Sequence, residues 1–199
     1  MNLTRRKVVA IVFFAVAIMF LFLCLRRNDN IESTLSRMIS TRINMNLSYM
    51  ECFSSSVVTS KCEGSSDSIS KYKLVVFTDS TECSPCNISR ITDWKDVAQD
   101  IFKDCYSDAK LLFIISPSRR KMQEIRQIVE ESSMDWPIYL DTAYVFQKVN
   151  IQIPDNRLFH VFLLNENDEI LCVGNPLYNE KIRRIYKTVI KERNINNSL

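Results

Sequence analysis

The sequence predicts an α/β protein with a mixed central sheet, preceded by one long apolar helix. Two observations lead to this prediction. From Lys71 onward, apolar strand-like runs alternate with amphipathic helical patterns, as is typical of βαβ units. Near the amino terminus, the 18 residues from Val8 to Leu25 are uncharged and strongly apolar. The 199 residues have room for one domain and an N-terminal appendage.

The apolar segment predicts a transmembrane signal anchor over residues 1–27. As a helix it reaches roughly 27 Å, close to the hydrocarbon thickness of a bilayer. Basic residues flank it on both sides, and their distribution favours an amino terminus on the inside. A cleavable signal peptide is the alternative, although no Ala-x-Ala site follows. Cys24 is interpreted as an apolar membrane residue, because Leu23 stands where a lipidated cysteine needs a small neighbour.

Residues 28–70 are predicted to form a short helix, a strand and a serine-rich loop. Apolar residues recur at helical spacing from Ile31 to Ile39 and then alternate with polar residues from Ile43 to Tyr49. The stretch from Cys52 to Ser70 shows no periodicity. Cys52 and Cys62 either close this loop as a structural disulfide or are two unpaired thiols. Outside the cytoplasm such a disulfide would persist.

Residues 71–199 are predicted to form the main domain. We expect strands at 72–78, 110–116, 137–140, 159–165 and 169–173, and helices at 85–104, 118–132, 142–150 and 179–193. The unbroken apolar run from Leu111 to Ile115 is typical of a central parallel strand. The last two strands form a hairpin that turns at Glu166-Asn167-Asp168. Two βαβ crossovers, this hairpin and a closing helix predict a mixed sheet packed between helices.

The motif Cys83-Ser84-Pro85-Cys86 follows the first of these strands by five residues and opens the next predicted helix. Unpaired amides and the helix dipole favour an anion at such a position, and would lower the pKa of the Cys83 thiol. We expect Cys83 to attack a disulfide and Cys86 to resolve the mixed disulfide. Glu82 places a negative charge beside Cys83, which would raise its pKa and make the pair more reducing.

His160 is the only histidine of the chain. Beside the dithiol it could exchange protons with Cys86 or stabilise the Cys83 thiolate, or it could be a polar residue with no catalytic role. Two thiolates and one imidazole could also bind Cu(I) or Zn(II), although we expect no metal and no other cofactor. Cys105 and Cys172 stand at apolar positions and are interpreted as buried packing residues.

Charge and composition exclude several classes of protein. The net charge of +3 is too small to indicate a nucleic-acid partner. Two glycines and five prolines are too few for a collagen-like chain or a glycine-rich phosphate-binding loop.

Four stretches around the motif resemble the thioredoxin-like superfamily, and within it the TlpA-like and redoxin-type membrane-anchored thiol:disulfide oxidoreductases. The stretches are Leu74-Val75-Val76-Phe77, Trp136-Pro137-Ile138-Tyr139-Leu140-Asp141, Phe162-Leu163-Leu164-Asn165 and Val173-Gly174-Asn175-Pro176. The resemblance implies a thioredoxin-like α/β/α sandwich and a redox-active disulfide between Cys83 and Cys86. It further implies a single-pass protein of the inner membrane, with its amino terminus inside and its domain in the periplasm. The expected partners are extracytoplasmic proteins that carry disulfides or dithiols, and a membrane electron donor.

The sequence departs from the thioredoxin pattern at three positions. His160 stands where that family has a cis-proline, Phe77 where it has a buried acid, and Glu82 where it has a tryptophan. The Ser84-Pro85 pair between the cysteines and the acidic Glu82 favour a disulfide reductase, and two alternatives stay open. One is a non-catalytic thioredoxin-like binding module in which the two cysteines form a structural disulfide. The other is a metallochaperone for copper or zinc.

Overall fold

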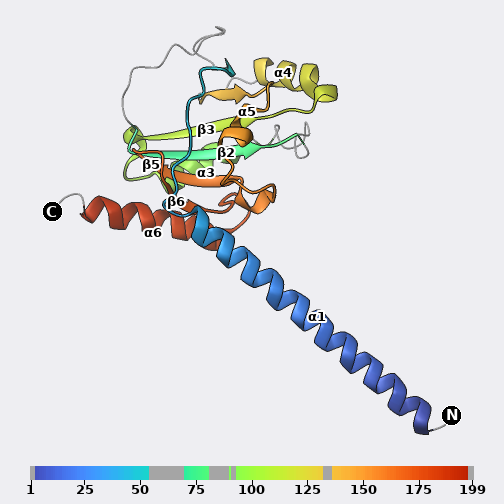
Figure 1. Ribbon diagram of the computed structural model, residues 1–199. Coiled ribbons are helices and arrows are strands. Elements are labelled where there is room, and N and C mark those ends of the chain that lie inside the picture. Colours follow the sequence, from blue (N-terminus) through green and yellow to red (C-terminus); the bar gives the residue numbers. More distant parts are fainter. Residues whose placement is uncertain (1–2, 54–69, 81–89, 91–92, 132–135, 197–199) are drawn as a thin grey trace. The chain divides into compact units, whose positions relative to one another are not determined.

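The computed structural model describes residues 3–53, 70–80, 90, 93–131 and 136–196, and the chain divides into the compact units Met1–Arg37 and Met38–Leu199. The first unit holds most of the helix α1 (Leu3–Met38) (Figure 1). Within α1 the side chains at 11–21 are exposed, and most are large and apolar, such as Phe13 at 72% and Phe14 at 70%. Across the described part of the chain, no helix is both long and apolar enough to cross a membrane. The predicted span from Val8 to Leu25 extends past the described side chains on both sides and stays a prediction.

The second unit is built on a six-stranded mixed sheet in the order β1-β4-β3-β2-β5-β6. The strands are β1 (Glu51–Phe53), β2 (Tyr72–Thr78), β3 (Ala109–Ile115), β4 (Ile138–Leu140), β5 (Val161–Asn165) and β6 (Ile170–Val173). β2, β3 and β4 run parallel, whereas β1, β5 and β6 pair antiparallel to their neighbours. The predicted mixed sheet is confirmed.

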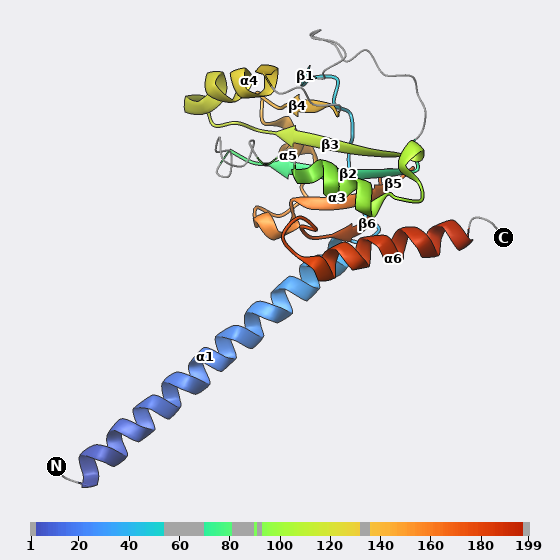
Figure 2. The ribbon, with the colours of Figure 1, turned by 180° about the vertical axis from the view of Figure 1, so that it is seen from behind.

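Helices cover both faces of this sheet. They are α3 (Asp93–Ile101), α4 (Met122–Glu131), α5 (Val145–Val149) and α6 (Glu180–Asn196), with the 3-10 turns η1 (Tyr106–Asp108), η2 (Arg119–Lys121) and η3 (Arg157–Phe159). α3, α4 and α6 share one apolar core with the sheet. Figure 1 shows the face that α5 covers, and Figure 2 shows the opposite face with α3 and α6.

The central strands are apolar throughout because both faces are covered. In β2, Tyr72, Leu74 and Val76 belong to the core beneath α3 and α6. The ring of Phe77 points to the other face, where its centroid lies 5.2 Å from that of Phe146 in α5. The five residues from Leu111 to Ile115 in β3 are all buried, so that the predicted central parallel strand is confirmed.

Most predicted strands agree with the structure within one or two residues, whereas several helices differ. The predicted helix 118–132 begins as η2 and continues as α4. α5 is shorter than the predicted 142–150, because Tyr144 has a left-handed backbone (φ 57°, ψ 40°) that an α-helix cannot continue through. The predicted helix 85–104 is described only from residue 93, as α3, which ends at Ile101.

The strand expected at 43–49 is absent, and the first strand of the sheet is β1 at 51–53 instead. Side-chain oxygens of Asn44 and Asn46 accept hydrogen bonds from the amides two residues on, at 3.0 Å and 3.2 Å. Such local turns compete with a sheet ladder for the backbone amides. Just before them, the amide of Ile43 donates to the carbonyl of Asp168 at 2.8 Å, which fixes this segment beside the β5-β6 hairpin.

The topology fits a thioredoxin-like fold. A parallel β2-α3-β3 unit is followed by a hairpin, β5-β6, and by a closing helix, α6. β5 pairs antiparallel with β2, so the hairpin lies beside the strand that precedes the Cys83-Cys86 motif. The additional pair β4 and α5 extends the sheet on the side of β3.

Candidate functional site

A polar residue follows each of the three parallel strands at the edge of the sheet where their carboxyl ends meet. Asp79 follows β2 by one position, Ser116 follows β3 and Asp141 follows β4. All three are buried, with exposures of 8%, 2% and 1%. We call this cluster the polar edge. β2 is the strand that precedes Cys83 in the sequence. The polar edge, where β2 ends, is therefore the part of the described structure that matters most for the predicted dithiol.

Backbone hydrogen bonds hold the polar edge together beyond the ends of the strands. The amide of Ser116 donates to the carbonyl of Thr78 at 2.8 Å, and the amide of Asp141 donates to the carbonyl of Ile115 at 2.8 Å. The parallel registers β2-β3 and β3-β4 therefore continue by one residue into the site. Each polar residue starts from a fixed backbone position.

The Asp141 carboxylate fixes the start of α5. It accepts hydrogen bonds from the amides of Val145 at 2.9 Å and Phe146 at 2.8 Å, and the hydroxyl of Ser116 lies 3.4 Å from its Oδ2 atom. The carboxylate oxygens thereby accept from amides that a helix start leaves without intrahelical partners. Burial, and then the negative charge of Asp141, raise the pKa of Tyr49.

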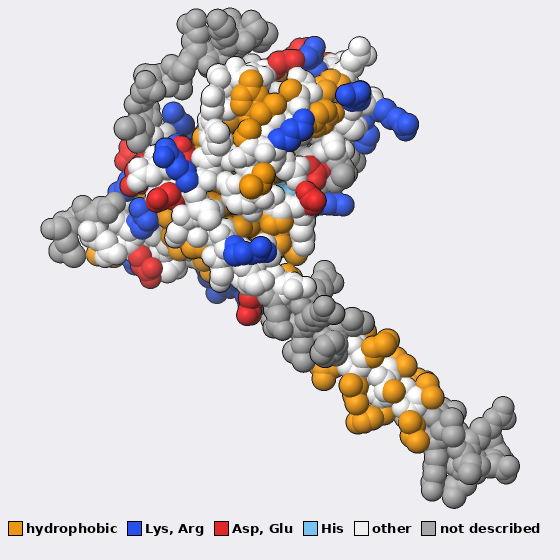
Figure 3. Space-filling model, viewed as in Figure 1, with side chains coloured by type: hydrophobic (Ala, Val, Ile, Leu, Met, Phe, Trp, Pro, Cys, Tyr) orange, Lys and Arg blue, Asp and Glu red, His pale blue; other side chains and the backbone are white. Residues whose placement is uncertain are grey.

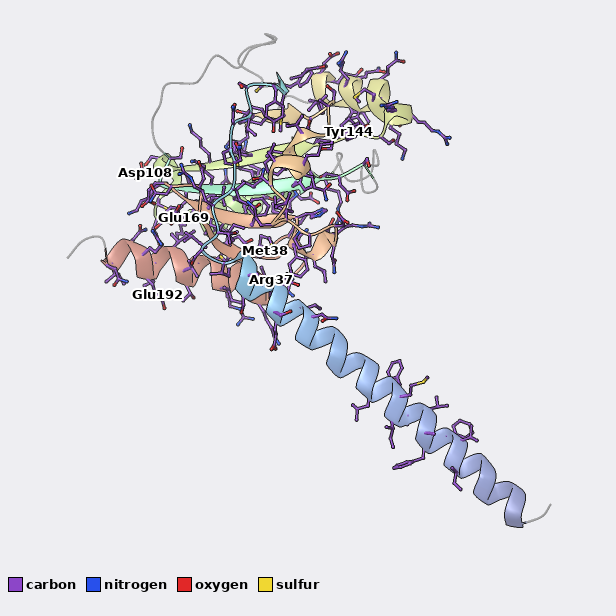
Figure 4. All side chains as sticks on the ribbon, viewed as in Figure 1. Arg37, Met38, Asp108, Tyr144, Glu169 and Glu192 are labelled. Atoms are coloured by element: carbon purple, nitrogen blue, oxygen red, sulfur yellow. The ribbon has the colours of Figure 1, made fainter. Side chains whose placement is uncertain are left out.

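Tyr144 stands between Asp141 and α5 in the left-handed region, with φ 57° (Figure 4). This conformation is rare for a residue with a bulky side chain. Its hydroxyl donates to the carbonyl of Pro117 at 2.7 Å. Tyr144 thereby ties the loop after β4 to the chain that leaves β3.

His160 is buried at 1% exposure, one residue before β5. Its carbonyl accepts from the amide of Phe77 at 2.9 Å, and the two ring centroids lie 4.9 Å apart. Its Nε2 atom lies 2.9 Å from the carbonyl oxygen of Pro154. Since a carbonyl only accepts, this Nε2 carries a hydrogen. The structure thus places His160 beside the carboxyl end of β2; its place beside the dithiol and its catalytic role stay predictions.

The cysteines of the motif, Cys83 and Cys86, lie outside the described residues, as does Cys62. Cys52 in β1 is buried and disulfide-bonded, and its partner lies outside the described residues. The pairing of Cys52 with Cys62 therefore stays a prediction.

Cys105 and Cys172 are free and buried, as the sequence indicated. Burial raises the pKa of Cys172 to about 12. Burial, and then the negative charge of Asp108, raise the pKa of Cys105. Because only a thiolate is a good nucleophile or metal ligand, neither residue suits disulfide exchange at neutral pH.

Asp79, Ser116, Asp141 and Tyr144 are the site residues that sequence reasoning missed. The first three carry a simple signal, which is a polar residue directly after a buried strand in an α/β pattern. Tyr144 carries none, because no glycine or asparagine marks its left-handed backbone. Among the described residues, no group of three or more His, Cys, Asp or Glu side chains is placed to hold a metal ion.

Comparisons with known proteins give matches in structure alone. No family model matches the sequence, and no curated protein matches it. The chain is similar to a thioredoxin-like protein from Bacteroides caccae, with 14% identity and a TM-score of 0.44 over 76% of this chain. It spans 50% of the length of that protein.

Two further similar structures come from Bacteroides thetaiotaomicron. One is a provisionally assigned protein disulfide isomerase, with 19% identity and a TM-score of 0.47 over 77% of this chain and 88% of that one. The other is the C-terminal domain of a provisionally assigned thiol-disulfide oxidoreductase, with 16% identity and a TM-score of 0.47 over 78% of this chain and 99% of that one. At these identities and TM-scores, the fold assignment rests on the strand order and directions given above.

Proposed function

We propose that the chain is a membrane-anchored, extracytoplasmic thiol:disulfide oxidoreductase that reduces disulfides of partner proteins with Cys83 and Cys86. The observation that supports this function most directly is the position of β2. β2 ends at Thr78, directly before Asp79 of the polar edge. Cys83, the first cysteine of the CxxC motif, follows Thr78 by five residues in the sequence. In an open α/β sheet, ligands are met outside the carboxyl ends of the strands.

The reaction is two successive thiol-disulfide exchanges. The Cys83 thiolate attacks one sulfur of the partner's disulfide, forms a mixed disulfide and releases the partner's other sulfur as a thiolate. The Cys86 thiolate then attacks the Cys83 sulfur, which releases the second partner thiol and leaves a Cys83-Cys86 disulfide. Two electrons and two protons have passed to the partner. A membrane dithiol donor then has to supply two electrons and two protons, which reduce the Cys83-Cys86 disulfide before the next cycle.

Two buried groups of the described structure suit the proton transfers. Asp79 lies four residues before Cys83 and has an exposure of 8%. We propose it as the carboxylate that takes the proton from Cys86. In thioredoxins this is the role of a buried acid at the position that Phe77 occupies here. His160 is the second candidate, because its backbone is hydrogen-bonded to Phe77 next to the end of β2.

The membrane anchor is part of the same proposal. The side chains of α1 at 11–21 are exposed and mostly apolar, and basic residues flank the apolar segment from Val8 to Leu25 in the sequence. An inside amino terminus would place the domain in the periplasm, where partners with disulfides occur. Extraction of membranes with carbonate tests this location, since a peripheral protein would be released and an anchored one retained.

Trapping of a mixed disulfide tests the catalytic proposal. A Cys86→Ser variant keeps the attacking thiol and lacks the resolving one, so we expect it to accumulate a covalent adduct with a disulfide-containing peptide. The matched Cys83→Ser variant should form no adduct. If neither variant forms an adduct and the wild type reduces no disulfide, the oxidoreductase proposal is wrong.

One observation favours a non-catalytic binding module as a second candidate. No peptide bond among the described residues is cis, and the residue before β5 is the buried His160. The position that seats a substrate backbone in thioredoxins is therefore changed. A redox titration separates the candidates, because an inert structural disulfide would have a potential below about −300 mV, whereas a catalytic pair would have a higher one.

A further inference from the structure

The turn η2 carries three consecutive basic residues, Arg119, Arg120 and Lys121. We call it the basic turn. Arg119 and Arg120 are exposed, and Lys121 is partly exposed. Within the part of the chain that the structure describes, none of the three has a carboxylate within 4.0 Å. Three positive charges therefore lie within one short turn.

Several other cations of the domain are paired with acids. The described ion pairs join Lys73 to Asp168, Arg126 to Glu51, Arg90 to Asp93, Lys187 to Asp100, Arg193 to Glu166, and Arg183 to Asp100 and Glu180. The basic turn differs from these paired cations because its adjacent like charges repel one another and no acid among the described residues pairs with them. Such an arrangement suits an anionic partner.

The basic turn is held at the same edge of the sheet as the polar edge. It begins three residues after Ser116, whose amide is bonded to the carbonyl of Thr78 at the end of β2. In Figure 1 the carboxyl ends of β2 and β3 point to the side where α4 begins, and Figure 3 shows Lys and Arg side chains gathered there. The basic turn therefore lies at the same edge of the sheet as the carboxyl end of β2, the strand that precedes Cys83 in the sequence.

Its backbone is fixed by groups that the proposed redox chemistry does not use. The Tyr144 hydroxyl holds the carbonyl of Pro117, directly before the N-cap of η2, at 2.7 Å. The left-handed backbone of Tyr144 is unfavourable for this residue type. A turn whose backbone is held in place in this way loses less conformational freedom when it binds a partner.

We propose that the basic turn is a docking site for an acidic segment of the partner protein whose disulfide is reduced. This inference rests on the proposed function and specifies its substrate class. The acidic segment would pair with Arg119 and Arg120 while the adjacent disulfide reaches Cys83. Arginine suits this contact because its planar guanidinium binds carboxylates through two parallel hydrogen bonds.

Binding of redox-inert peptides tests the docking site separately from the chemistry. The probes are two labelled peptides with serine in place of cysteine, one flanked by glutamates and one by glutamines. They are titrated against the full chain in a non-ionic detergent. We expect the acidic peptide to bind about tenfold more tightly at about 50 mM salt, and the preference to shrink at about 300 mM.

Matched variants test whether the preference for the acidic peptide comes from the basic turn. The combined change Arg119→Gln, Arg120→Gln and Lys121→Gln should abolish it. The combined change Lys181→Gln, Arg184→Gln and Lys191→Gln removes the same charge from exposed positions of α6 and should preserve it. If both variants lose the preference equally, only net charge matters and the docking site is wrong. Arg120→Gln alone, expected to lose about threefold, keeps the test valid if a triple variant fails to fold.

Two further results would overturn the inference. One is an unchanged acidic preference in the basic-turn variant. The other is a loss confined to binding of phosphatidylglycerol over phosphatidylcholine vesicles, which would make the turn a membrane contact. Disulfide-containing versions of the peptides then separate the two proposals. If the acidic peptide docks but is never reduced, the oxidoreductase proposal fails and the docking site stands; if both peptides are reduced equally fast, the reverse holds.

Discussion

The imidazole of His160 donates a hydrogen bond through Nε2 to the carbonyl oxygen of Pro154, six residues earlier in the chain, at 2.9 Å. The bond closes the loop that leads into β5, and the same residue accepts from the amide of Phe77 in β2. His160 therefore joins the loop, β5 and the end of β2. This positioning role does not depend on redox chemistry.

We expect His160→Ala to lower the free energy of unfolding by about 2–4 kcal/mol, because it removes a buried ring and leaves the Pro154 carbonyl without this donor. His160→Gln keeps an amide donor and should lose about half as much. Urea denaturation followed by tryptophan fluorescence measures both. Equal losses in the two variants would mean that the hydrogen bond to Pro154 contributes nothing.

Asp141 is expected to be the residue on which α5 depends. Asp141→Ala leaves two amides, those of the partly buried Val145 and the buried Phe146, without their acceptor, and should cost about 2 kcal/mol of stability. Hydrogen exchange should speed up at these two amides first. The control is Asp155→Asn, whose side chain accepts from exposed Gln147 and should change stability by less than about 0.5 kcal/mol. Unchanged exchange at α5 in Asp141→Ala would contradict the capping role.

The sheet could be predicted from the sequence because its strands are buried on both faces. Leu111 to Ile115 form an unbroken apolar run, and the structure places all of them in the interior. The alternation of apolar and polar residues from Ile43 to Tyr49 predicted a strand, and this prediction is wrong, although Ile43 is buried. Side-chain oxygens of Asn44 and Asn46 take the amides that a strand would have used. The spacing of apolar residues predicts which side chains are buried. It does not predict which acceptors the backbone amides bond to.

The candidate site as a whole was only partly predictable for a similar reason. His160 was singled out because it is the one histidine, and its place beside β2 follows from the strand order. Asp141 and Ser116 become neighbours only through the pairing of β3 with β4. The hydroxyl of Tyr144 meets the carbonyl of Pro117, which lies 27 residues earlier in the chain. Relationships of this kind require tertiary contacts, which no local pattern contains.

Asp79→Asn tests the proposed proton transfer. The variant keeps the shape of the buried side chain and removes its ability to accept a proton, so the release step through Cys86 should slow by about 10²-fold or more near neutral pH. The rate should recover as the pH rises and Cys86 ionises unaided. Quenched-flow measurement of adduct decay gives this pH profile. Asp155→Asn is the exposed control, and a pH-independent loss in Asp79→Asn would indicate a structural role only.

Cys172 should be the least reactive of the described free thiols. Burial raises its pKa to about 12, so roughly one thiol in ten thousand is a thiolate at pH 8. We expect iodoacetamide to label it only as fast as the protein unfolds, which mass spectrometry of labelled peptides measures. Labelling of Cys172 in native protein at the rate of a free cysteine would contradict its burial.

The same pKa predicts how stability changes in alkali. The folded state keeps the Cys172 proton up to about pH 12, whereas the unfolded chain releases it near the ordinary value of 9.0. Since the unfolded chain then binds fewer protons, the free energy of unfolding should fall as the pH rises above 9.0 toward 12 and should be unaffected by this group below pH 9.0. Cys172→Val fills the site with a side chain that does not titrate. Urea denaturation at a series of pH values should show a shallower alkaline loss for this variant, and identical slopes would place the Cys172 thiol in contact with water.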